Sequence, residues 1–163
     1  RSPIQRQTIV ESVMAYLVGI ILAILVAAFA RCVGLDRDRA FYPTVLVVVA
    51  SYYDLYAVIG GSMSVLAAEL AVTCIFLAVV VVGFKRDLRI VAAGLVGHGL
   101  FDLVHGHLID NPGLPAFWPA FCMSYDLVAG GLLFWMLRPH RPMRASSRGS
   151  SRNGAREPGV AAR

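Results

Sequence analysis

SMSVLAAELAVTCIFLAVVVVGF, residues 62–84, is the stretch of sequence that decides the fold class. It contains one charged residue, Glu69, and is otherwise made almost entirely of apolar side chains. A helix of about 20 apolar residues crosses the ~30 Å hydrocarbon core of a bilayer, and this stretch is long enough to do so. A helix on the surface of a soluble protein would show a polar face, which this stretch lacks. It is therefore predicted to be a transmembrane helix.

Four further apolar runs are separated by short polar segments. They cover residues 9–30, 43–60, 88–108 and 119–137. Hydrophobic residues make up 58% of the chain and charged residues 15%, whereas soluble domains carry about 25% charged residues. The sequence thus predicts an all-α integral membrane bundle of about five transmembrane helices over residues 1–138. The runs other than 9–30 and 62–84 are shorter or more polar, so we expect them to face other helices along part of their length.

Residues 139–163 differ from the rest of the chain in composition. They are basic, rich in Ser, Gly and Pro, and almost free of large apolar side chains. Such a segment cannot bury a core, so we predict a disordered tail that is attracted to anionic lipid headgroups. Nucleic-acid binding is not expected, because no aromatic residues interleave with the basic ones and no nucleic-acid-binding fold accompanies them.

Basic residues gather on one side of the predicted bundle. If the N-terminus lies on one side of the membrane, the other side holds loop 31–42, loop 85–89 and the tail. That other side holds all of the 15 Lys and Arg residues except Arg1 and Arg6. The positive-inside rule makes it cytoplasmic. We therefore expect a multi-pass protein of a bacterial-type inner (plasma) membrane, with its N-terminus outside and its C-terminus in the cytoplasm.

The first run, residues 9–30, also has features of a signal peptide. Two arginines precede it, and Ala28-Phe29-Ala30 fits a cleavage site. However, the run is longer than a usual signal core, and its removal would place the basic loops outside. A retained helix is the preferred interpretation, and cleavage stays an open alternative.

Six ionisable residues fall inside the predicted spans: Asp54, Glu69, His98, Asp102, His105 and Asp126. Each costs at least ~2–3 kcal/mol at a helix centre if it is left unpaired. At 1.5 Å of rise per residue, all but His98 lie within ~10 Å of the side opposite the basic loops, and His98 lies at ~15 Å. Chance would scatter such residues over the full depth. The sequence therefore predicts a polar cluster in the outer half of the bilayer.

The segment GHGLFDLVHGH, residues 97–107, is the densest part of this cluster. His98, Asp102 and His105 have the spacing i, i+4, i+7 and fall within about 60° of one another on a helix. Two imidazoles and a carboxylate suit a divalent metal, with zinc the preferred ion. Asp126 is predicted to complete the ligand set, with Glu69 or Asp54 as alternatives that could also orient the histidines from outside it. His107 points to the opposite side of the helix and is left out.

Two acids are predicted as candidates for the general base of such a site. These are Glu69 and Asp54, which reach the same depth from other helices. Cys74 is expected to serve plain packing. Cys122 lies nearer the non-basic side, so a ligand role is possible for it but is not the preferred interpretation. The short loop 110–119 contains three prolines and is expected to be a rigid connector with an aromatic anchor, or else a lid over the cluster.

The function expected from these residues is metal-assisted hydrolysis of a lipid-like substrate that enters from the outer leaflet. Two alternatives remain open. The polar residues of the spans can pair with one another and hold the bundle together, in which case the chain is a non-enzymatic subunit that assembles with partner membrane subunits. The same residues can also form a proton or cation pathway.

Three segments, residues 38–61, 97–107 and 111–131, together resemble a family of small bacterial polytopic membrane proteins to which no activity is assigned. That resemblance implies the fold but no reaction. A looser similarity connects Ser51, Asp54, His98 and His105 with ceramidase-like membrane metal hydrolases. It implies a type of mechanism only, since those proteins have seven helices and a different histidine spacing and motif order.

Overall fold

The computed structural model describes residues 3–138, and the regular elements of that part of the chain are all helices. Its elements are α1 (Pro3–Val33), a short 3₁₀ helix (Leu35–Arg37), α2 (Phe41–Ile59), α3 (Met63–Lys85), α4 (Leu88–Leu108) and α5 (Trp118–Met136). Five of these helices are long and apolar enough to cross a membrane. This confirms the predicted all-α membrane bundle. The predicted tail, residues 139–163, lies outside the described residues.

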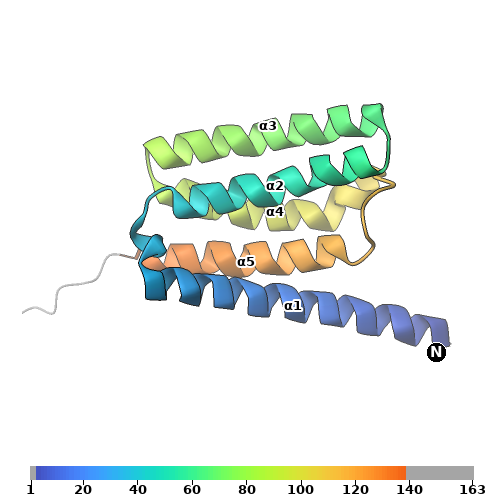
Figure 1. The fold of residues 1–163 in the computed structure, drawn as a ribbon, viewed down its shortest axis with the longest axis horizontal. Helices are drawn as coiled ribbons and strands as arrows, with labels where there is room; N and C mark the ends of the chain where they lie inside the picture. The colour runs from blue at the N-terminus through green and yellow to red at the C-terminus, as the bar shows by residue number, and fades with distance from the viewer. Residues whose placement is uncertain (1–2, 139–163) are drawn as a thin grey trace, which may run out of the picture.

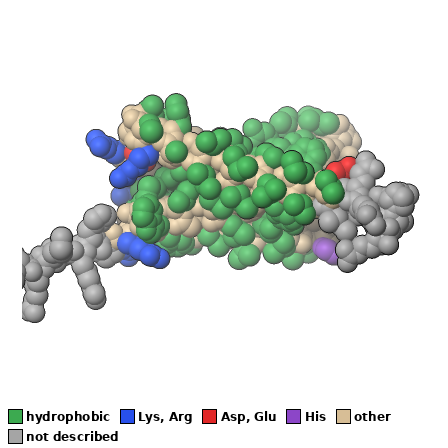
Figure 2. All heavy atoms as spheres, turned by 90° about the horizontal axis from the view of Figure 1, so that it is seen from below, with side chains coloured by type: hydrophobic (Ala, Val, Ile, Leu, Met, Phe, Trp, Pro, Cys, Tyr) green, Lys and Arg blue, Asp and Glu red, His purple; other side chains and the backbone are tan. Residues whose placement is uncertain are grey.

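The helices lie side by side, with α4 behind α2 and between α3 and α5 (Figure 1). Helix α4 packs against α2, α3 and α5, whereas α1 packs mainly along α5. Large apolar side chains of α1 and α3, such as Leu25 and Ile75, point away from the bundle and are more than half exposed. The long flanks of the molecule are accordingly hydrophobic in the space-filling view (Figure 2). A surface of this kind is suited to lipid hydrocarbon.

Glycines allow α5 to lie close against α4. A Cβ atom on Gly99 would come within 3.0 Å of the Met123 carbonyl oxygen and 3.2 Å of Asp126 Cβ. At Gly130 a Cβ would lie 2.9 Å from the Ala92 carbonyl oxygen. Small residues of this kind let two backbones approach closely in membranes. The contact at Gly99 is what brings Asp126 up to the histidine face of α4.

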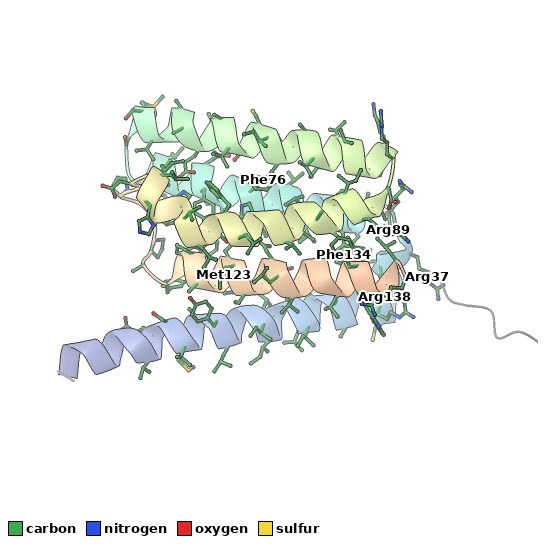
Figure 3. All side chains as sticks on the ribbon, turned by 180° about the vertical axis from the view of Figure 1, so that it is seen from behind. Arg37, Phe76, Arg89, Met123, Phe134 and Arg138 are labelled. Carbon is green, nitrogen blue, oxygen red and sulfur yellow. The ribbon has the colours of Figure 1, made fainter. Side chains whose placement is uncertain are left out.

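Arginines gather at one end of the bundle, which we call the basic end and which contains the connections 34–40 and 86–87. Arg37, Arg89 and Arg138 lie together there (Figure 3), and the opposite end shows acidic and histidine side chains (Figure 2). Two arginines bind the last carbonyl groups of neighbouring helices. Arg39 donates to the carbonyl oxygens of Phe84 (2.7 Å) and Arg86 (3.1 Å), and Arg89 donates to that of Leu137 (3.2 Å). They satisfy groups that a helix C-terminus leaves without partners.

Candidate metal centre

The polar face of α4 is buried in the bundle. His98, Asp102 and His105 are 1%, 4% and 0% exposed, as their i, i+4, i+7 spacing predicts for one inward face. Aromatic rings surround the two imidazoles. The Phe76 ring, which points from α3 toward α4 (Figure 3), lies 4.8 Å from the His98 ring, and the Tyr53 ring lies 4.3 Å from the His105 ring. These ring contacts help to bury both imidazoles.

Four of the buried residues form one compact group, which we call the metal group: His98, Asp102, Cys122 and Asp126. Each offers one ligand atom, and these atoms all lie within 4.8 Å of one another. His98 Nδ1 lies 2.7 Å from Asp126 Oδ2 and 3.9 Å from Asp102 Oδ2, and Cys122 Sγ donates to Asp126 Oδ2 at 3.6 Å. The structure therefore brings three of the predicted ligands together.

Two carboxylate oxygens in this group have no hydrogen-bond partner among the described residues. Neither Asp102 Oδ2 nor Asp126 Oδ1 accepts a hydrogen bond from any described residue, although both atoms are buried. The other oxygen of Asp102 accepts a 2.6 Å hydrogen bond from the Tyr53 hydroxyl. A hydroxyl that binds one carboxylate oxygen and leaves the second free is a common way of orienting a metal ligand.

The donor set of this group suits zinc. One imidazole nitrogen, one sulfur and two carboxylate oxygens are all zinc ligands, and four of them make the tetrahedral shell that this ion prefers. A divalent ion would also balance the charge of two carboxylates held in a bundle core, where an unpaired charge is costly.

His105 is not part of the metal group, which departs from the predicted ligand set. Its Nε2 lies 2.9 Å and 3.2 Å from the two carboxylate oxygens of Glu69. The physical reason is distance along the helix, since residues seven apart are separated by ~10 Å of rise, even when they share a face. Ligands of one ion must lie within a few ångströms of it. The prediction of His105 as a ligand rested on its angular position around the helix axis and not on its distance along that axis from His98.

Glu69, His105 and Asn111 form a second buried group, which we call the glutamate group. The Asn111 amide donates to Glu69 Oε1 at 2.9 Å and to the Tyr53 carbonyl oxygen at 3.2 Å. Asn111 was included in the sequence analysis only as a member of loop 110–119. The loop that carries Asn111 contacts the glutamate group, because the Asn111 amide reaches inward to Glu69 while Asn111 Oδ1 accepts from Gly113 N at 3.2 Å.

Tyr53 connects the two groups, and its neighbour Asp54 belongs to neither. The Tyr53 ring contacts His105 of the glutamate group, and its hydroxyl binds Asp102 of the metal group. Asp54 is half-buried, and its Oδ1 has no hydrogen-bond partner among residues 3–138. The general-base roles of Glu69 and Asp54 stay predictions.

Cys122 is the metal-group member that the sequence analysis did not select. A signal for it exists in the sequence, because Cys122 and Asp126 have the same i, i+4 spacing on α5 as His98 and Asp102 have on α4. Two such pairs on neighbouring helices can together supply four ligand atoms to one metal ion. Counted from the nearer helix ends, Asp102 and Asp126 lie ~9 Å and ~12 Å inside the end of the bundle that is opposite the basic end.

No protein-family model, curated protein or solved structure matches the chain.

Proposed function

We propose that this protein is a zinc-dependent membrane hydrolase that acts on a lipid-like substrate. The observation that carries the proposal is the metal group, four buried ligand atoms within 4.8 Å of one another inside a bundle of membrane-spanning helices. Zinc supplies Lewis acidity and an activated water molecule in sites of this kind. The scissile bond of a lipid in the bilayer lies at the depth of such a centre. A water-soluble substrate would instead have to enter from the end of the bundle.

A second candidate function is structural, and a specific observation favours it. All four residues of the metal group are less than 5% exposed, and four protein ligands make a closed zinc shell, which is typical of structural sites. In that case zinc would join α4 to α5, and the bundle would serve as a subunit of a larger membrane complex.

One experiment separates these two functions. Protein purified in detergent without chelator is expected to hold about one zinc per chain. Reconstituted into vesicles of mixed phospholipid and ceramide-type lipid, it is expected to release fatty acid, and a chelator should stop the release. Zinc without hydrolysis would support the structural function, and absence of stoichiometric zinc would overturn both.

We also propose that the basic end faces the cytoplasm, because of the positive-inside rule. Cys32 is exposed beside that end, and its labelling can report the orientation. A membrane-impermeant maleimide is expected to label Cys32 in inverted vesicles and not in intact cells. An Asp110→Cys variant made in a Cys32→Ala background should show the reverse pattern, since Asp110 is exposed at the opposite end. Labelling of Cys32 in intact cells would contradict the orientation.

A further inference from the structure

An apolar cleft of about 330 Å³ lies between α1, α2 and α5. Leu22 and Val26 line it from α1, Val45 and Val48 from α2, and Cys122 and Tyr125 from α5. The cleft exists because α1 packs along α5 and α2 packs along α3 and α4, so that α1 and α2 do not close against each other. All three of its walls are membrane-spanning helices, which means that the cleft lies at the depth of lipid hydrocarbon.

The length of the cleft along α2 matches one acyl chain, and the cleft extends from Phe41, at the basic end of α2, past the middle of the bundle. Along α2 its lining extends from Phe41 to Tyr52, which is ~16 Å of helical rise. The hydrocarbon core is ~30 Å thick, so one leaflet contributes about half of it. A single acyl chain of a bilayer lipid has the length and the chemistry to fill this space.

The cleft is more polar at the end opposite Phe41. At its Phe41 end the hydroxyl of Thr44 already donates to the Ala40 carbonyl oxygen. Cys122 belongs both to the cleft lining and to the metal group. Trp118, at the same end, also lines the cleft, and its indole N–H is buried with no hydrogen-bond partner in the described part of the chain. The ring of Trp118 is fixed by Tyr52 at 5.0 Å and Tyr56 at 4.9 Å. A buried indole N–H normally has a partner, and a lipid carbonyl oxygen is an acceptor that can supply one.

We propose that the cleft binds one acyl chain of a membrane lipid that enters at the non-basic end and reaches past the middle of the bundle. The chain lies along α2 toward Phe41, and the carbonyl group stays at the level of Trp118 and Cys122, beside the metal group. The assignment of this lipid as substrate rests on the proposed hydrolase function, whereas the binding of the acyl chain does not.

Tryptophan fluorescence can test this binding, because Trp118 and Trp135 are the two tryptophans of the chain. A Trp135→Phe variant leaves Trp118 as the single reporter. The detergent-solubilised variant is titrated with a phospholipid that carries bromine atoms along one acyl chain. Quenching of Trp118 is expected to saturate at about one lipid per chain, as for a defined pocket.

Two matched variants provide the control. Val48 lines the cleft and is 46% exposed, while Val81 lies on α3 away from it and is 51% exposed. Val48→Phe is expected to weaken the saturable quenching about tenfold by filling the cleft, and Val81→Phe should leave it unchanged.

The outcomes distinguish the acyl-chain site from the zinc proposal when zinc is measured in the same samples. Quenching that rises without saturation, or that responds equally to Val48→Phe and Val81→Phe, would overturn the acyl-chain site even if zinc is present. Saturable quenching without zinc would support the acyl-chain site and remove the hydrolase function.

Discussion

Replacing His98 by alanine is expected to lower the zinc content of the purified protein at least tenfold. His98 supplies the only imidazole of the metal group, and even the loss of a group that merely orients a ligand costs about 10–100-fold in metal affinity. Zinc per chain, measured by elemental analysis after size-exclusion chromatography in detergent, checks this expectation. The chromatography also shows whether the variant is folded.

Three further variants make the prediction specific. His105→Gln is expected to keep its zinc, because His105 pairs with Glu69 outside the metal group and glutamine can still donate to that carboxylate. His107→Ala should also keep it, since His107 is exposed. Tyr53→Phe, which removes the hydroxyl bound to Asp102 Oδ1, should weaken zinc binding about tenfold. Equal loss of zinc in His98→Ala and His105→Gln would contradict the assignment of ligands.

The sulfur ligand has a spectroscopic test of its own. Cobalt(II) bound in place of zinc is expected to show a sulfur-to-cobalt charge-transfer absorption, because a thiolate is a soft ligand that binds such ions directly. Cys122→Ser should abolish this absorption while changing little in the packing of α5. A cobalt spectrum that is the same in both proteins would exclude Cys122 from the ligand set.

Replacing Glu69 by alanine is expected to lower the free energy of unfolding by about 3–5 kcal/mol. Glu69 is 1% exposed. Its carboxylate accepts a hydrogen bond from the Asn111 amide and lies 2.9 Å from His105 Nε2. Its removal leaves the buried amide of Asn111 and the imidazole of His105 without this partner, and each unsatisfied buried group costs about 1–3 kcal/mol. Reversible unfolding in mixed detergent micelles, followed by circular dichroism, measures the loss.

A neighbour on the same helix is the matched control. Leu70 is 45% exposed on the outer face of α3, so Leu70→Ala should stay within about 0.5 kcal/mol of the wild type. Glu69→Gln retains one acceptor oxygen and should recover part of the lost stability. If Glu69→Ala unfolds like Leu70→Ala, the glutamate group does not hold the connection 109–117 to α3.

Much of the fold follows from the sequence alone. The five apolar runs predict the five helices and their ends within a few residues, except that α1 begins at Pro3 rather than at residue 9. Length and apolarity suffice for this, because a bilayer permits few structures other than helices of about 20 residues. The depth of the polar residues also follows from counting 1.5 Å per residue along each helix.

The sequence by itself therefore determined the fold class, the helices and the depth at which polar side chains meet. Only the tertiary structure decided which of them meet, namely His98 with Asp126 and Cys122, and His105 with Glu69 and Asn111. The physical reason is that transmembrane helices carry apolar side chains on their lipid-facing and their packed sides alike, so hydrophobic periodicity does not tell which face of one helix lies against another. That choice is made by close contacts such as Gly99 against α5, which no pattern within a single helix records.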